Sequence, residues 1–388
     1  NASDGAREGG GGGARAPHRF RHPTSSRETW GLPSSSQSSF VRASSILPGT
    51  TMDPPPLVCV AGVGALGASL AAYMIDAGLC PVLVSRGAQA HALQHEGLRL
   101  QDLDGTIRLI SPERFMLYKT DCERDPITGR YSKRPKNPKT GHFLKRPNCP
   151  KVDVALITCK NHQVAGLLDF LELVLAPSGV VVTCCNGVGA SKAAISRFGR
   201  DRVVLATTTH AADLTEPGWV RRAGEGTLVL GPSAATTADA PPPPPPPALS
   251  ALLECPKLRC TWDANIGLVV SRKLLMNAAI NAIAAIAKVV NGELAGPELW
   301  PSVLAVCEET LPIMAASGMP CPSLSEAVAD LESILAATAS NRCSTLKDVL
   351  LGRRTEVDAI NGAIVDMAKE SGMPAPLNNL LVALVNKL

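Results

Sequence analysis

The stretch Val58-Cys-Val-Ala-Gly-Val-Gly-Ala-Leu-Gly67 decides the fold of this chain. Its apolar start, Val58–Ala61, predicts a buried strand, and the segment Leu66–Ala77 predicts a helix that Gly78 closes. Between them, the first glycine permits a tight turn, the second lets backbone approach a pyrophosphate, and the third lets the helix pack on the strand. We therefore expect a dinucleotide site, the alternative being a chance glycine-rich turn in another α/β fold. The expected cofactor contacts in this turn are Gly62, Val63, Gly64, Ala65, Leu66 and Gly67.

The next predicted strand, Pro81–Ser85, is followed directly by Arg86. An NAD site would place an Asp or Glu here, where its carboxylate bonds the ribose hydroxyls. Arg86 instead offers a guanidinium that can pair with a 2′-phosphate, and no carboxylate stands beside it to repel that group. The sequence therefore favours NADPH as the cofactor, the alternative being a solvated arginine at a strand end.

Strand-like and helix-like segments alternate up to Trp262, and the remainder of the chain is helical. This order predicts an α/β fold, in which an N-terminal Rossmann-type NADP-binding domain with a parallel sheet precedes a C-terminal all-α domain. Besides those named above, the predicted strands are Val152–Thr158, Val180–Cys184 and Arg202–Ala206, with hairpins at Gly97–Leu100 and Thr106–Ile110 and at Val220–Arg222 and Thr227–Leu230. The predicted helices are Ala88–His95, His162–Leu175, Ala190–Phe198, 271–290, 297–317, 323–340, 354–370 and 377–387.

Composition divides the chain further. We expect residues 1–51 to be a disordered leader or a transit-like segment, because they are rich in Gly, Ser, Arg and Pro and poor in acids. Residues 52–262 would be the Rossmann domain, with a basic inserted loop at 119–151 and a proline-rich loop at 232–247. Residues 263–388 would be the all-α substrate and catalytic domain.

Charge and cysteine usage limit the class of protein. The net charge is +4, but residues 1–51 contribute +3 and residues 119–151 contribute +7, so the rest carries −6 and gives no reason to expect nucleic acid. The twelve cysteines include no CxxC and no spaced Cys/His quartet, so we expect reduced intracellular thiols and no metal. The most apolar stretch, 271–290, contains a lysine and two asparagines, which argues against a membrane span.

Polar residues follow two of the predicted parallel strands. Lys160 comes after the strand ending at Thr158, and Asn186 comes after the strand ending at Cys184. Ligands of open α/β sheets bind at the carboxyl ends of the strands, so both side chains could reach the nicotinamide end of a cofactor and the substrate. His210 follows the next strand, but it lies in a run of small residues, and a structural histidine bonded to backbone is the favoured interpretation.

The predicted helix 271–290 carries a polar ladder of Lys273, Asn277 and Asn281 at spacing i, i+4, i+8. This spacing places the three side chains on one side of the helix. The ladder either bonds to neighbouring backbone in a packed core or lines a cleft with a polar ligand, and the stretch alone favours neither. Further along, Ser344 and Glu356 either cap helices or complete that cleft opposite Lys273.

The sequence resembles the ketopantoate reductase (2-dehydropantoate 2-reductase) family across about residues 57–388. The matching stretches are GVGALG at 62–67, Arg86, ITCK at 157–160, NGVG at 186–189, TTTHAA at 207–212, KLLMNAAIN at 273–281, NGEL at 291–294, NRCSTLKD at 341–348 and TEVDAING at 355–362. Two departures lie in the ladder helix: Ser271 stands where the family usually has Trp, and Ala282 where it usually has Pro.

The resemblance implies NADPH-dependent reduction of 2-dehydropantoate to pantoate, in pantothenate and coenzyme A biosynthesis. It makes Lys273 the general acid, with Glu356 keeping that ammonium charged and oriented. The implied substrate contacts are Asn186, Lys273, Asn277, Asn281, Asn291 and Ser344, and the implied cofactor contacts are the glycine turn, Arg86, Lys160, Asn186, Ala212 and Glu356.

Three matters stay open at this point. The alternatives for the function are an NADPH-dependent reductase of another 2-keto acid and a non-catalytic NADPH-binding regulator on the same fold. We expect a small-molecule 2-keto acid as the partner, with no nucleic acid and no membrane, and a monomer or homodimer. The expected location is the cytoplasm, or an organelle if residues 1–51 are a transit segment.

Overall fold

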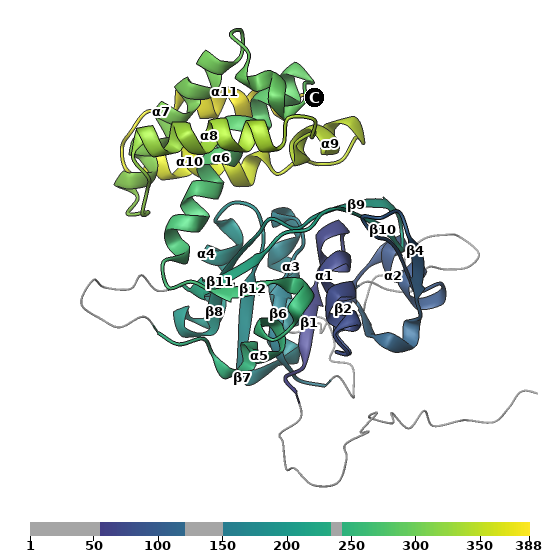
Figure 1. The fold of residues 1–388 in the computed structure, drawn as a ribbon. Helices are drawn as coiled ribbons and strands as arrows, with labels where there is room; N and C mark the ends of the chain where they lie inside the picture. Colours follow the sequence, from purple (N-terminus) through teal and green to yellow (C-terminus); the bar gives the residue numbers. More distant parts are fainter. Residues whose placement is uncertain (1–54, 121–149, 234–242) are drawn as a thin grey trace, which may run out of the picture. The chain divides into compact units, whose positions relative to one another are not determined.

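The computed structural model describes residues 55–120, 150–233 and 243–388. The predictions for residues 1–51, and for most of the basic segment 119–151, lie outside these ranges. Within them, the chain folds as an α/β part followed by helices, which confirms the predicted fold class (Figure 1). Both parts belong to one compact unit.

The central sheet has eight strands in the order β12-β11-β8-β7-β6-β1-β2-β5. All neighbouring pairs are parallel except β11 with β8, which are antiparallel. The sheet is therefore mixed rather than wholly parallel. Its strands are β1 (Val58–Ala61), β2 (Val82–Ser85), β5 (Met116–Lys119), β6 (Val152–Ile157), β7 (Leu175–Thr183), β8 (Val203–Thr208), β11 (Leu228–Pro232) and β12 (Cys260–Trp262). Strands β5 and β12 were not predicted from the sequence. Lys119, the last residue of β5, was expected in an inserted loop.

A second sheet of four strands lies beside α1 and α2, in the order β4-β3-β10-β9. Its strands are β3 (Leu98–Gln101), β4 (Ile107–Ile110), β9 (Ala211–Glu216) and β10 (Trp219–Gly224). The predicted hairpin of β3 and β4 is confirmed. The predicted hairpin of 220–222 with 227–230 is wrong: β10 pairs with β9 and β3, whereas β11 crosses into the central sheet and pairs with β8 and β12. Alternating apolar residues predict a strand but do not identify its partner.

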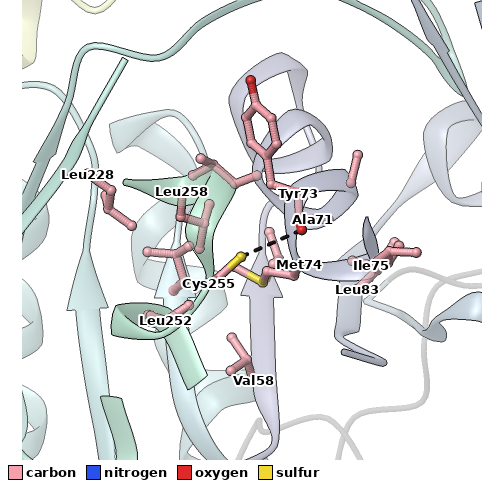
Figure 2. Close-up of a cluster of buried hydrophobic side chains, with 14 of the residues drawn as sticks. Val58, Ala71, Tyr73, Met74, Ile75, Leu83, Leu228, Leu252, Cys255 and Leu258 are labelled. Carbon is pink, nitrogen blue, oxygen red and sulfur yellow. Dashed lines mark hydrogen bonds between the residues drawn. The ribbon is translucent and has the colours of Figure 1, made fainter. Parts of the chain in front are cut away.

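Five helices pack on the α/β part: α1 (Ala65–Asp76), α2 (Gly87–His95), α3 (Val164–Val174), α4 (Gly189–Phe198) and α5 (Ser250–Leu253). Figure 2 shows the buried cluster around α1, where Tyr73, Met74 and Ile75 meet side chains of β1, β2, β11 and the 252–258 segment. The Cys255 thiol donates a hydrogen bond of 3.6 Å to the Tyr73 carbonyl. Because aromatic residues are few, small and branched aliphatic side chains and the thiols of Cys184 and Cys255 fill this core.

The C-terminal part consists of α6 (Ile266–Ala287), α7 (Trp300–Ala316), α8 (Leu324–Ala337), α9 (Ser344–Leu350), α10 (Val357–Glu370) and α11 (Pro376–Val385). Helix α6 forms its centre, because Leu274, Leu275 and a series of alanines on α6 are buried against α7, α9, α10 and α11 (Figure 1). The short helix α9 was not predicted. The last strand ends at Trp262 and α6 begins at Ile266, so the predicted domain boundary at 262 and 263 lies between these elements.

Helix α6 also meets the α/β part, at β8 and β11. Among the described residues it is the one helix long and apolar enough to cross a membrane, by length and composition alone. Two thirds of its most apolar window, 67%, is buried inside the protein, as expected for a core helix.

A cluster of charges around the buried Arg222 joins α1 to the small sheet. The guanidinium of Arg222, which is 5% exposed, lies 3.6 Å over the ring of Tyr73 and donates to Asp102. Arg108 donates to the same carboxylate at 3.2 Å and to Asp76, on α1, at 2.6 and 2.7 Å. Four charged groups therefore compensate one another between α1 and the small sheet.

Candidate active site

The glycine-rich turn has the geometry that a dinucleotide needs. Gly62 has φ +102°, and a Cβ placed on it would lie 2.5 Å from the Cβ of Cys159, so a side chain is excluded. A Cβ on Gly67 would lie 2.4 Å from the Gly62 carbonyl, which is the close helix–strand packing expected of the third glycine. A Cβ on Gly64 would meet nothing within 4 Å. The space over Gly64, and the start of α1 without a side-chain cap, fit a bound diphosphate.

A group of charged side chains lies at the carboxyl ends of β6 and β7. The Lys160 ammonium lies 2.6 Å from the Asp348 carboxylate of α9 and 3.6 Å from the Glu356 carboxylate that precedes α10. Asp348 and Glu356 are both buried, each 7% exposed. Lys160 and Glu356 were each predicted as cofactor contacts, but neither their ion pair nor Asp348 as a partner of Lys160 was predicted from the sequence.

Glu356 also organises the asparagines at this edge. One carboxylate oxygen accepts from the backbone N–H and the side-chain amide of Asn161, both at 3.1 Å, and the other accepts from the Asn186 amide at 3.0 Å. Asn161 further donates to the Asn186 carbonyl. Asn161 was not predicted either, although it comes directly after Lys160 at the same strand end and could have been included on that ground.

The ammonium of Lys273 is held by main chain. It donates a hydrogen bond of 2.9 Å to the carbonyl of Thr208, the last residue of β8. Burial lowers the pKa of Lys273, while Cys184 and Glu356 act in the opposite direction. Burial also raises the pKa of the Cys184 thiol to about 11, so this thiol is neutral near pH 7. Among ion pairs of the described residues, none joins Lys273 to Glu356 directly, so the carboxylate acts on the ammonium through space.

A small pocket brings three predicted site residues together. Asn186 follows β7, and Lys273 and Asn277 are the first two residues of the ladder on α6. The pocket walls also include residues of α4 and β8. Neither Ser271 nor Ala282 lines it; both are buried, at 0% and 1% exposure, on other sides of α6. The two departures from the family pattern therefore change the packing of α6 rather than the wall of this pocket.

Three other predicted substrate contacts gather around the segment 341–344, outside the lining of that pocket. The backbone N–H of Asn291 donates to the Asn341 carbonyl, and its buried side chain donates to Thr338. The Cys343 thiol donates to the carbonyl of Asn281, the third ladder residue. Ser344 begins α9 and is exposed.

The two remaining predicted cofactor contacts are Arg86 and Ala212. Arg86 is exposed between β2 and α2. Burial lowers the pKa of the nearby His162, the cations Arg354, Arg86 and Lys160 lower it further, and the Glu356 carboxylate acts in the opposite direction. Ala212 lies on β9, partly buried against the core around α1.

His210 has the structural role that was expected of it. Its Nδ1 accepts from the backbone N–H of Gly226 at 3.2 Å, which leaves Nε2 as the protonated nitrogen donating to the Leu258 carbonyl at 3.0 Å. Both ring nitrogens are therefore engaged with backbone. Within the described ranges, no three His, Cys, Asp or Glu side chains are grouped to hold a metal ion.

Comparisons with known proteins extend this description. The family described as ketopantoate reductase PanE/ApbA matches residues 58–235, and its C-terminal family matches residues 265–388. The 2-dehydropantoate 2-reductase of Archaeoglobus fulgidus is 30% identical over 329 residues, covering 84% of this chain and 96% of the relative. That of Halobacterium salinarum is 28% identical over 336 residues, covering 84% and 97%.

Solved structures share the fold. The ketopantoate reductase of the PanE/ApbA family from Ralstonia eutropha JMP134 aligns with a TM-score of 0.67 at 24% identity, covering 85% of this chain and 97% of that one. A D-mandelate dehydrogenase with NADH and anilino(oxo)acetate aligns with a TM-score of 0.70 at 20% identity, with the same coverage.

Fold and site together define a Rossmann-type protein whose glycine-rich nucleotide turn is combined with a helical part carrying a lysine–asparagine ladder. The family comparisons make the assignment specific. The chain belongs to the ketopantoate reductase family, PanE/ApbA.

Proposed function

We propose that this protein catalyses the NADPH-dependent reduction of 2-dehydropantoate to pantoate, the step of pantothenate and coenzyme A biosynthesis that its curated relatives are named for. The observation that carries the proposal is the pocket that Lys273, Asn186 and Asn277 line together. A cation and two amides can bind a ketone oxygen together with the polar groups of a small acid.

Lys273 is the proton donor of the proposed reaction. Bound NADPH supplies the hydride that reduces the ketone carbon. As negative charge develops on the ketone oxygen, the ammonium of Lys273 stabilises it and then delivers a proton from Nζ. The Thr208 carbonyl fixes the direction of that ammonium, and the Glu356 carboxylate favours its charged form.

The cofactor would bind along the strand edge. Its diphosphate would lie on the glycine-rich turn and the start of α1, where Gly64 leaves open space. Arg86 would pair with the 2′-phosphate, because it is an exposed guanidinium directly after β2 with a second cation, Arg354, in the same neighbourhood. Further cofactor contacts proposed are Lys160, Asn186, Ala212 and Glu356.

The substrate, a small-molecule keto acid, would be held by amides and a hydroxyl. Asn186 and Asn277 line the pocket with Lys273, and the group around residues 341–344 supplies Asn281, Asn291 and Ser344. We propose that these three residues also contact the bound substrate. Neutral donors of this kind match the hydroxyl and carboxylate of ketopantoate.

We further propose a monomer or homodimer that acts in the cytoplasm, or in an organelle, without nucleic acid or membrane partners. Supporting this, the charge outside residues 1–51 and 119–151 is negative, and 67% of the most apolar window of α6 is buried in the protein. The division into domains at 52–262 and 263–388 is proposed on the order of the elements.

The test is NADPH oxidation by the purified protein with ketopantoate and with other 2-keto acids, followed by absorbance. We expect ketopantoate to be reduced with the highest kcat/KM. We expect Lys273→Ala to lower kcat by roughly 10²–10⁴-fold because the proton donor is lost, with NADPH binding nearly unchanged. Because only the ammonium form donates, wild-type kcat should fall as pH rises through the lowered pKa of Lys273.

Lys369→Ala, which removes an exposed lysine on α10, is the matched control and should keep full activity. Equal kcat in Lys273→Ala and wild type would contradict the role of Lys273. Higher kcat/KM with another keto acid would assign the protein to that substrate, and binding of NADPH without turnover of any acid would indicate a regulator.

A further inference from the structure

The charges around Lys160 do not cancel. One ammonium lies between two buried carboxylates, those of Asp348 and Glu356, so the group as a whole carries −1. The ammonium is not shared equally: its Nζ is 2.6 Å from Asp348 but 3.6 Å from Glu356. Asp348 is therefore the nearer partner of Lys160, and the ammonium compensates the charge of Glu356 only in part.

The near oxygen of Glu356 already has another partner. The Glu356 oxygen that faces Lys160 accepts the Asn186 amide at 3.0 Å. A closer approach of Lys160 would compete with Asn186 for this oxygen and would neutralise the carboxylate. Asn186 and Lys273 line the same pocket, and Glu356 acts on the charge of Lys273, so both would be affected.

We propose that Asp348 is a positioning residue, which holds the ammonium of Lys160 away from Glu356 so that the Glu356 carboxylate stays available to Asn186 and Lys273. The inference rests on the proposed function, because it gives Lys273 the part of the proton donor. Asp348 touches neither Lys273 nor the pocket lining; it acts through Lys160.

Other ionisable groups surround this arrangement. Cys184, after β7, is the second titratable group that bears on Lys273, and its thiol is neutral near pH 7 because burial raises its pKa to about 11. His162, Arg86 and Arg354 lie at the same strand edge as Lys160 and Glu356. These three groups are unchanged in the variants below, so they contribute equally to every measurement.

The experiment varies the charge of the group by one unit in each direction. Asp348→Asn keeps the shape and a hydrogen-bond acceptor but brings the group to zero, and Lys160→Met brings it to −2. The double variant restores −1. The midpoint of the Lys273 titration is read from its carbon-13 Cε signal in protein labelled at lysine, assigned with Lys273→Arg, and needs no turnover.

We expect Asp348→Asn to lower that midpoint by about half a pH unit or more and Lys160→Met to raise it. Because Asp348 acts through Lys160, the double variant should stay near the midpoint of Lys160→Met. The pH at which kcat falls should move in the same directions. Asp366→Asn, an exposed carboxylate on α10 paired with Lys369, is the matched control and should leave both unchanged.

Shifts in one direction for both single variants, no shift in either, or a double variant that returns to the wild-type midpoint would each overturn the inference. Summed charge alone predicts that return, because the double variant restores −1, so the double variant separates positioning through Lys160 from a direct charge effect. If the midpoints move as expected but no keto acid is reduced, the proposed function fails while the charge relation stands. If turnover is normal and the midpoints stay fixed, only the positioning role fails.

Discussion

Lys273 illustrates how a charged side chain can be kept at a partly buried position. Removing an ammonium from water is costly, and burial accordingly lowers its pKa. The compensation comes from the Thr208 carbonyl at 2.9 Å and, at longer range, from the Glu356 carboxylate. Since Glu356 bonds Lys160, Asn161 and Asn186 directly, one carboxylate serves several cationic and amide groups at once.

Arg86 provides the residue-scale prediction on the cofactor. Arg86→Ala should raise the KM for NADPH by roughly 10–100-fold, since a charge-assisted contact to the 2′-phosphate contributes about 1.5–3 kcal/mol. The KM for NADH should change little, because NADH has no phosphate there. Steady-state kinetics with both cofactors measures this, with Arg99→Ala on the small sheet as the control. A parallel loss for the two cofactors would refute a contact with the 2′-phosphate.

At the scale of elements, the turn between β7 and α4 brings the two parts of the protein into backbone contact. Gly187 has φ +75°, and a Cβ placed on it would lie 2.1 Å from the carbonyl oxygen of Ala359, on α10. Only a residue without a side chain allows α10 to come this close. The adjacent Asn186 is positioned by the same approach, since its amide bonds Glu356 directly before α10.

Gly187→Ala should therefore disturb the site as well as the turn. We expect α10 to be displaced and kcat/KM to fall by about 10²-fold, as for a misplacement of about 1 Å. Gly199→Ala is the control, because Gly199 has φ +83° at the other end of α4 and a Cβ there would meet nothing within 4 Å. It should lower stability by about 1 kcal/mol without reducing kcat/KM. Similar kinetics for the two variants would contradict the explanation.

For the whole molecule, the packing of α1 against the small sheet depends on the charge cluster around the buried Arg222. The side chain of Arg222 is 4% exposed, and Asp102 accepts from both Arg222 and Arg108. A buried cation that loses its partner is strongly destabilising, whereas a compensated one is tolerated. The small sheet should thus be the part of the fold most sensitive to loss of one carboxylate.

Asp102→Ala should lower the free energy of unfolding by about 3 kcal/mol, because it leaves the Arg222 guanidinium buried without its main acceptor. Urea unfolding followed by circular dichroism measures this. Asp104→Ala, which removes an exposed carboxylate two residues away, should have a much smaller effect. Equal losses in the two variants would show that the buried cluster contributes little.

The sequence predicts those features that depend on local spacing. The glycine turn, the strand ends carrying Lys160 and Asn186, and the ladder on α6 follow from order and periodicity along the chain. Asp348 could not be predicted as the partner of Lys160, because 188 residues separate them and only the tertiary fold brings them together. The same reason applies to β10 and β11, whose partners lie in different sheets.

The acceptor that anchors Lys273 belongs to the peptide group of Thr208 rather than to its side chain. A codon change at position 208 alters the side chain and leaves that oxygen in place. Substitutions can thus change the side chains around Lys273 while its hydrogen bond to this carbonyl is retained. Variants with altered substrate specificity should therefore arise from substitutions of the surrounding asparagines, while the orientation of the Lys273 ammonium stays the same.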